Sequence, residues 1–155
     1  MAGQHESMSD IDIRLTDQPL DLNAAYDFVQ RPEAGGIAIF LGVVRDHNRG
    51  REVDHLVYEA YGPMAEREMR RIAEEAVARW QCRIAIHHRT GRLEIGEASV
   101  LVAVSTAHRA DAFAACRYAI DTLKETVPIW KREVWSDGEA WIEGAGEAPV
   151  TAPGG

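Results

Sequence analysis

Two nearly continuous apolar runs constrain the fold of this chain more than any other feature of its sequence. They cover residues 37–44 and 98–104. A strand that is apolar at almost every position is typical of a sheet covered on both faces, so we expect both runs to be central strands. A polar loop at 46–50 separates the first run from a second strand at 53–61, which predicts a hairpin with a long connection.

Three helices are predicted from apolar residues that recur every three or four positions. They are a short helix between Pro19 and Pro32, a long helix over 63–81, and a last helix that ends before Pro128. The apolar stripe of the last helix consists of Phe113, Cys116, Ile120, Leu123 and Val127. We therefore expect three amphipathic helices that each pack on a sheet through one face.

The remaining strands are predicted mainly from alternating apolar and polar residues. They are 10–15, 83–89, 129–135 and 139–143, with a short extended segment or turn at 92–95. Asp137-Gly138 between the last two strands favours a tight hairpin turn. Because most neighbouring strands are joined by hairpins, the predicted fold class is α+β: a sandwich in which three helices cover a mostly antiparallel sheet.

The length of the chain suits one domain. A chain of 155 residues buries roughly two-thirds of its unfolded surface when it folds, so it needs no stabilising disulfide or metal. We expect one folded domain over 10–144, a polar disordered leader at 1–9, and a flexible Gly- and Pro-rich tail at 145–155. The final Gly154-Gly155 is interpreted as part of that tail.

The charge balance argues against two classes of partner. The chain has 25 Asp and Glu against 17 Lys and Arg, and its net charge is -8 at pH 7. Nucleic acids and anionic membranes are bound through a basic face, so neither is an expected partner. The N-terminus has no apolar leader segment, and no run approaches the roughly 18 apolar residues of a membrane span. We therefore expect a cytoplasmic protein.

No metal site or cofactor is predicted. Cys82 and Cys116 are 34 positions apart and have no second ligand at metal-binding spacing, so we expect two buried thiols in a reducing compartment. His87 and His88 are adjacent residues of a predicted strand. Their side chains should point to opposite faces, so they cannot readily hold one ion together.

A basic segment at 124–133 is the strongest candidate for a functional site. Lys124, Lys131 and Arg132 lie close together in a chain that is acidic overall. Pro128 between them ends the helix and starts an extended segment, and such junctions often carry sites. The alternative is that Lys124 only complements the helix dipole while the other two cations are solvated.

A second candidate lies at the start of the same helix. His108 and Arg109 follow the apolar run 98–104, where a helix N-terminus offers free amide hydrogens and a partial positive charge. They could complete an anion site there. The alternative is an ordinary helix cap from Ser or Thr, followed by two exposed polar residues.

Five segments, in this order, resemble those of the large, catalytic subunit of molybdopterin synthase: 40–48, 58–61, 87–91, 105–109 and 124–133. The resemblance runs from about residue 10 to 143. It implies an α/β hammerhead fold and a homodimer of this subunit. It also implies a heterotetramer in which a small ubiquitin-like sulfur carrier binds at each end.

The resemblance also implies a reaction. The carrier's C-terminal Gly-Gly, as a thiocarboxylate, would enter a pocket of the large subunit and transfer sulfur to cyclic pyranopterin monophosphate. This sulfurtransferase step forms the dithiolene of molybdopterin in molybdenum cofactor biosynthesis. The residues that the resemblance assigns to the pocket are Val43, Val44, Arg45, His108, Arg109, Lys124, Lys131, Arg132 and Glu133.

Roles for these cations follow from their charge. Two like charges about 6 Å apart repel by roughly 3 kcal/mol at an effective dielectric constant of about 20, so a cluster needs an anionic ligand. Such crowding lowers the pKa of a lysine, which makes Lys124 the candidate acid or base and Lys131 its electrostatic partner. Arg45 and Arg109 would hold phosphate, and His108 is a second candidate for proton transfer.

Two other functions stay open at this stage. The same basic pocket could capture a carboxylate tail or a phosphorylated small molecule without chemistry, as a binding module. A phosphate-using enzyme such as a phosphotransferase is disfavoured because the sequence has no phosphate-binding glycine loop. Neither cysteine lies in a matching segment, so in the sulfurtransferase reading the sulfur comes from the partner.

Overall fold

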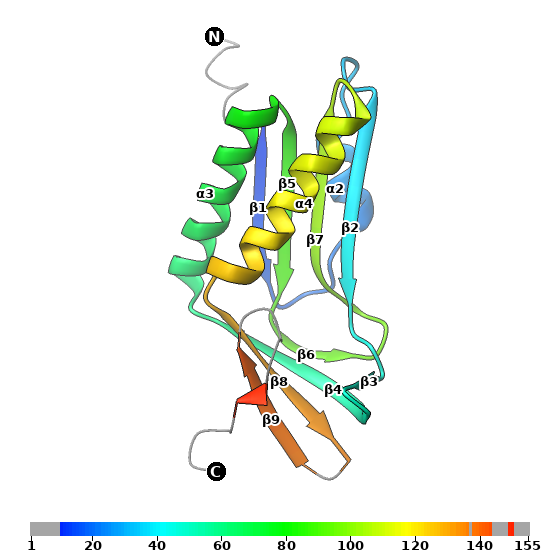
Figure 1. The fold of residues 1–155 in the computed structure, drawn as a ribbon, viewed down its shortest axis with the longest axis vertical. Helices are drawn as coiled ribbons and strands as arrows, with labels where there is room; N and C mark the ends of the chain where they lie inside the picture. The colour runs from blue at the N-terminus through cyan, green and yellow to red at the C-terminus, as the bar shows by residue number, and fades with distance from the viewer. Residues whose placement is uncertain (1–9, 137, 144–148, 151–155) are drawn as a thin grey trace.

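The computed structural model describes residues 10–136, 138–143 and 149–150. Its strands form two sheets that meet end to end, with the helices around the first (Figure 1). The elements are β1 (Ile11–Thr16), α2 (Leu22–Val29), β2 (Gly36–Val43), β3 (His47–Asn48), β4 (Arg51–Ala60), α3 (Gly62–Trp80), β5 (Arg83–Arg89), β6 (Gly91–Glu94), β7 (Ala98–Thr106), α4 (Arg109–Thr126), β8 (Ile129–Trp135), β9 (Gly138–Glu143) and β10 (Pro149–Val150).

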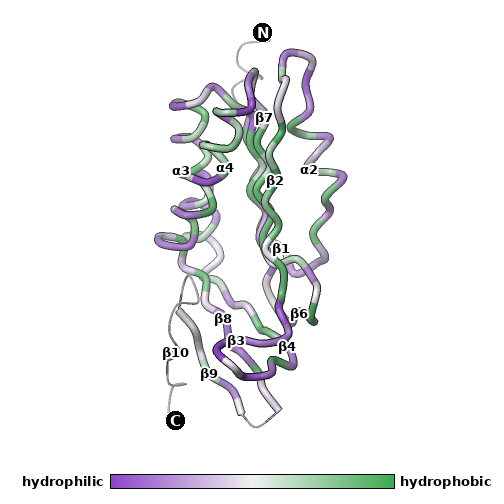
Figure 2. Tube along the Cα trace, turned by 45° about the vertical axis from the view of Figure 1, so that its right-hand side comes forward, coloured by the Kyte–Doolittle hydropathy of each residue, from purple (hydrophilic) through white to green (hydrophobic). Residues whose placement is uncertain are grey.

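The first sheet has the strand order β1-β5-β7-β2, and only the β1–β5 pair is parallel. Helices α3 and α4 cover one face and α2 covers the other (Figure 2). This double coverage explains why β7 is apolar at nearly every position, and its place inside the sheet confirms the prediction for 98–104. The α+β class, with three helices in the described part of the chain and mostly antiparallel pairing, is confirmed.

The second sheet has the order β10-β9-β8-β4-β3, and β6 pairs with β4 beside this path. All its pairs are antiparallel. Val127 is the C-cap of α4 and has extended backbone angles, so the chain turns directly from the last helical turn into β8. The predicted break before Pro128 is therefore confirmed, and it places the end of α4 against the second sheet.

Two predictions for the first apolar run were wrong. Strand β2 is an edge strand of the first sheet and does not pair with β4, which belongs to the second sheet. Several apolar side chains of β2, among them Ile39, Phe40 and Leu41, are exposed, so an apolar run does not by itself imply a central, doubly covered position. The local hairpin is instead β3–β4, whose turn residues Arg49 and Gly50 have φ angles of 54° and 81°, as a two-residue hairpin turn requires.

The predicted stripe of α4 was wrong at one position. Phe113 is 65% exposed, whereas the buried face of the helix consists of Ala112, Ala115, Cys116, Ala119, Ile120 and Leu123. Three alanines and Cys116 give this face small side chains, which let α4 lie close to the sheet and to α3. The bulky ring of Phe113 lies outside this buried face.

The chain ends lie mostly beyond what the structure describes. The leader predicted at 1–9 falls outside the described residues, as does most of the tail predicted at 145–155. Within that tail, Pro149–Val150 pairs with Trp141 and Ile142 of β9. None of the helices in the described part combines the length and the apolar character that a membrane crossing requires.

Candidate active site

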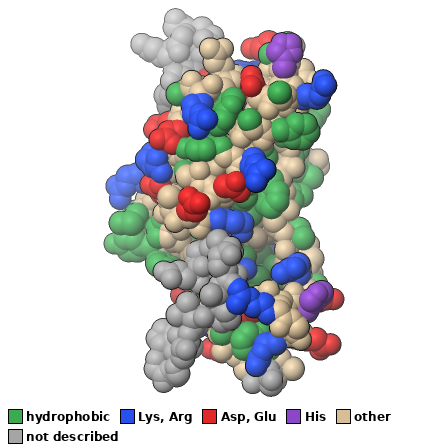
Figure 3. Space-filling view, in the orientation of Figure 1, with side chains coloured by type: hydrophobic (Ala, Val, Ile, Leu, Met, Phe, Trp, Pro, Cys, Tyr) green, Lys and Arg blue, Asp and Glu red, His purple; other side chains and the backbone are tan. Residues whose placement is uncertain are grey.

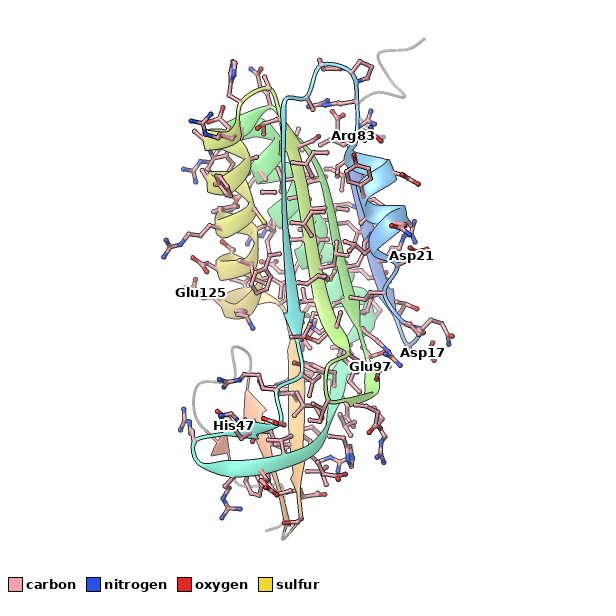
Figure 4. The ribbon with its side chains drawn as sticks, turned by 90° about the vertical axis from the view of Figure 1, so that its right-hand side faces the viewer. Asp17, Asp21, His47, Arg83, Glu97 and Glu125 are labelled. Atoms are coloured by element: carbon pink, nitrogen blue, oxygen red, sulfur yellow. The ribbon has the colours of Figure 1, made fainter. Side chains whose placement is uncertain are left out.

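A polar pocket lies where the two sheets meet. Its volume is about 240 Å³. It is bounded by the ends of β2 and β7, the last turn of α4, and strands β4 and β8, and its lining residues are Val43, Arg45, His47, Asn48, Val53, Leu56, Tyr58, Ser99, Lys124, Lys131 and Glu133. Lys and Arg side chains are spread over this face of the molecule, and several of them lie on its lower part (Figure 3). Figure 4 shows His47 on the segment that leads from β2 to β4, and Glu125, the neighbour of Lys124, at the lower end of α4.

The two lysines reach the pocket from different elements. Lys124 lies in the last turn of α4, and Lys131 lies on β8 opposite Tyr58 of β4. The turn at Pro128 brings them to the same wall although they are seven positions apart. The structure therefore brings Lys124, Lys131 and Arg45 together, as predicted from the sequence.

Arg132 lies outside the pocket. Successive strand residues point to opposite faces, so Lys131 and Glu133 share one face of β8 and Arg132 lies on the other. There its guanidinium donates to Glu139 at 2.9 Å and lies 5.7 Å from the ring centre of Trp141. Within the described part of the chain, Arg132 forms an ion pair with Glu139 and does not line the pocket.

Glu133 is a buried carboxylate that supports Arg45. It is 3% exposed and accepts hydrogen bonds from Asn48 Nδ2 at 2.7 Å and from Trp135 Nε1 at 3.0 Å. The Oδ1 atom of Asn48 in turn accepts from the Arg45 guanidinium at 3.4 Å. The chain of contacts ties the β3–β4 hairpin to β8 and holds Arg45 at the mouth of the pocket.

The two valines predicted for the site have different surroundings. Val43 lines the pocket and is largely exposed. Val44 is buried in a small apolar cluster with Val53, Leu56 and Leu93. Val44 thus forms part of the support beneath the pocket and does not line it.

His108 and Arg109 lie at the opposite end of α4. The helix separates His108 from Lys124 by about 24 Å, at about 1.5 Å per residue. Both residues line a separate hollow of about 480 Å³ beside Gly35 and Phe113. A Cβ atom on Gly36 would lie 3.0 Å from Arg109 Cα, so glycine lets the start of β2 approach this end of the helix. Within one chain, the residues predicted for the site therefore lie in two separate places, the pocket between the sheets and the hollow at the start of α4.

Sequence reasoning missed several residues of the pocket. His47, Asn48 and Tyr58 lie within segments that carry the family resemblance, so those segments were a signal that could have marked them. Ser99 has no such signal, because it is one polar residue in an apolar strand. Tyr58 is partly buried, and loss of solvation raises the pKa of its phenol.

The two adjacent histidines face opposite sides of β5, as predicted. His87 Nε2 lies 2.8 Å from Asp12 Oδ2, whereas the ring of His88 packs edge-on against Tyr58 at 5.2 Å. Among the residues that the structure describes, no three His, Cys, Asp or Glu side chains lie close enough together to hold a metal ion.

Comparison with known proteins identifies the family. Residues 15–126 match the sequence model of the family described as MoaE protein. The chain belongs to the MoaE family. A MoaE relative from Halalkalibacterium halodurans, named molybdopterin synthase catalytic subunit, is 48% identical over 129 residues, which are 83% of this chain and 83% of the relative. One of the same name from Pyrococcus abyssi is 50% identical over 141 residues, 89% of this chain and 95% of the relative.

A solved structure agrees with this assignment. The crystal structure of molybdopterin synthase from Staphylococcus aureus matches with a TM-score of 0.79 and 39% identity, over 85% of this chain and 96% of the other. The family predicted from the five segments is therefore confirmed, and so is its fold. Because the chain is a MoaE protein, the pocket between the two sheets is its candidate active site.

Proposed function

We propose that this chain is the catalytic subunit of a molybdopterin synthase. It transfers sulfur from the C-terminal thiocarboxylate of a small ubiquitin-like carrier to cyclic pyranopterin monophosphate. The observation that carries the proposal is the convergence of Arg45, Lys124 and Lys131 on one polar pocket in a MoaE chain. We place the reaction in the cytoplasm, in keeping with the buried free thiols of Cys82 and Cys116.

The charges of the pocket suit both reactants. A thiocarboxylate and a cyclic phosphate each carry a negative charge, and the three cations would neutralise them in a partly enclosed site where such interactions are strong. Lys124 is assigned as the acid or base, with Lys131 stabilising developing charge and Arg45 holding phosphate. The thiocarboxylate sulfur forms a bond to a side-chain carbon of the substrate and displaces an oxygen substituent there. Water then breaks the bond between the acyl carbon and sulfur, which leaves the carrier as a carboxylate.

A second copy of the chain would complete the site. A pocket of about 240 Å³ is small for a pterin and a peptide tail together, since ligand pockets usually measure about 300–1,000 Å³. In the described part of the chain no strand pairs with the outer edge of β2, and its exposed apolar side chains Ile39, Phe40, Leu41 and Val43 are 37–52% accessible. Such an edge favours pairing with another strand.

The geometry of β2 indicates how the copies would meet. Antiparallel pairing of β2 with β2 of a second copy, about a two-fold axis, places the start of one strand beside the end of the other. Eight residues of strand span about 26 Å, close to the distance of about 24 Å between the two ends of the predicted site along α4. His108 and Arg109 of one copy would then lie beside Arg45 and Lys124 of the other.

Reconstitution tests the function. The purified chain, a thiocarboxylated carrier and cyclic pyranopterin monophosphate are combined, and the product is measured as its oxidised fluorescent pterin. We expect product only when all three components are present. Unchanged substrate in the presence of a carrier that binds would instead favour the non-catalytic binding module.

A further inference from the structure

A second, smaller cavity lies behind the proposed active site. Its volume is about 20 Å³, which is room for one water molecule. It shares Tyr58, Ser99, Lys124 and Lys131 with the larger pocket. The polar side chain that lines only the smaller cavity is His88, which is 4% exposed.

The hydrogen bonding of His88 fixes the form of its ring. Nδ1 lies 2.9 Å from the carbonyl oxygen of Arg89. A carbonyl oxygen only accepts, so Nδ1 carries the hydrogen. Burial, together with the nearby charge of Lys124, lowers the pKa of His88 to about 4 despite that hydrogen bond. The imidazole is therefore neutral near pH 7, and Nε2 is a hydrogen-bond acceptor.

The other groups around the cavity complement this acceptor. Ser99 donates its hydroxyl hydrogen to the Gly42 carbonyl at 3.2 Å, and the raised pKa of Tyr58 keeps its phenol protonated. Lys124 and Lys131 supply ammonium donors from α4 and β8. A water molecule in this space has both a donor and an acceptor within the lining, which a stable buried water needs.

We propose that the small cavity holds one water molecule that accepts a hydrogen bond from Lys124 and donates one to Nε2 of His88. His88 is then a positioning residue, which fixes the Lys124 amine at the wall of the active site. Because the ring is neutral, it does this without repelling the Lys124 ammonium. The inference rests on the proposed function only for the role of Lys124 in sulfur transfer.

The ring itself provides the first test. Nitrogen NMR of imidazole-labelled protein near pH 7 should show a neutral ring with hydrogen on Nδ1, and the Nε2 resonance should shift in the Lys124→Ala variant. A hydrogen on Nε2 would overturn the proposal, since that atom could not accept. An Nε2 chemical shift that is the same in the wild type and in Lys124→Ala would overturn the proposal as well.

Kinetics provide the second test. His88→Phe keeps most of the volume but removes the acceptor, so we expect kcat to fall about tenfold with little change in KM. His88→Gln places a carbonyl oxygen near the position of Nε2 and should recover most of the loss. His87→Phe is the matched control, because His87 is equally buried on the same strand but bonds to Asp12 on the other face.

The outcomes separate the two proposals. Wild-type kcat in folded His88→Phe, or a His88→Gln variant as slow as His88→Phe, would assign His88 to packing alone and leave the proposed function intact. If the wild-type chain forms no product, the proposed function fails. The response of Nε2 to Lys124→Ala then still decides whether the water connects the two residues.

Discussion

Glu133 is a buried carboxylate that joins two parts of the pocket wall. Its two carboxylate oxygens each accept one hydrogen bond, from Asn48 and from Trp135. Both contacts are partly buried, and so the donors have little water to replace a lost partner. Arg45 is held through Asn48, which links this buried carboxylate to the residue proposed to bind phosphate.

We expect Glu133→Gln to destabilise the protein by about 1–3 kcal/mol. Both carboxylate oxygens accept hydrogen bonds, so the NH2 group that replaces one of them would face a donor and leave it without an acceptor. Urea unfolding measures the loss. The matched control is Glu139→Gln on β9, whose ion pair with Arg132 is more exposed and should cost less than about 1 kcal/mol. Equal stabilities of the two variants would contradict this assignment.

Lys124 is expected to act in the chemical step. Lys124→Ala should lower the single-turnover rate of sulfur transfer by about 10²- to 10⁴-fold, as is typical for loss of an acid or base, while the carrier still binds. Arg117→Ala on the same helix is the control, since Arg117 is exposed and pairs only with Asp121 in the described structure. A wild-type rate in Lys124→Ala would refute this role.

The cysteines are expected to be inert. Burial raises the pKa of Cys82 to about 12 and that of Cys116 to about 11, so almost no thiolate forms near pH 7. The double variant Cys82→Ala, Cys116→Ala should fold and transfer sulfur at the wild-type rate. If the folded double variant were inactive, a cysteine would have to carry the sulfur.

The same pKa shifts predict a pH dependence of stability. An unfolded thiol loses its proton near pH 8.5, well before the folded ones, so the unfolded state binds fewer protons above that pH. The stabilisation from the buried thiols is therefore complete below about pH 8.5 and declines as the pH rises toward 11. Urea unfolding at several pH values should show this decline in the wild type to a greater extent than in the double alanine variant.

Among single residues, strand alternation explains which of the predicted site residues on β8 reach the pocket. The run Lys131, Arg132, Glu133 was assigned to the pocket as a block, although alternate strand residues cannot share a face. Lys131 and Glu133 lie in the pocket and Arg132 does not. That distinction was available from the sequence, whereas the place of Ser99 was not, because it depends on how two sheets meet.

Among the elements, local periodicity predicted the helices and strands well, and the β8–β9 hairpin predicted from the sequence is confirmed, but the partner of β2 was predicted wrongly. A helix that is buried on one face repeats its apolar residues every three or four positions, so a short stretch of sequence is enough to predict it. Strand β2 pairs with β7, where Gly36 lies opposite Thr106, and no nearby residues encode so distant a partner. The predicted hairpin of β2 with β4 relied on closeness in sequence, which the change from one sheet to the other breaks.

The edge of β2 is expected to form the contact between two copies. Leu41→Lys adds a charge to an exposed apolar position, so it should leave the fold intact and shift the protein to monomer in sedimentation equilibrium. Leu22→Lys on α2, at a similarly exposed position, is the control and should remain dimeric. A dimer that persists in Leu41→Lys would place the contact elsewhere.

The whole molecule consists of two connected units with different roles. The first sheet, with its three helices, contains most of the apolar core and presents an open edge. The second sheet contributes Lys131, Glu133 and the hairpin that carries His47 and Asn48. The candidate active site lies between them, and α4 spans the distance from this pocket to the hollow lined by His108 and Arg109.

Subunit mixing tests most directly whether the active site is shared between two copies. Lys124→Ala and Arg109→Ala chains are each assayed alone and then after co-expression, with the carrier and substrate supplied. If Arg109 of one copy completes the site that contains Lys124 of the other, half of the randomly formed dimers are mixed, and each mixed dimer has one intact site of two. Activity should then return to about a quarter of the wild-type value. Activity that stays at the level of the single variants would contradict the shared site.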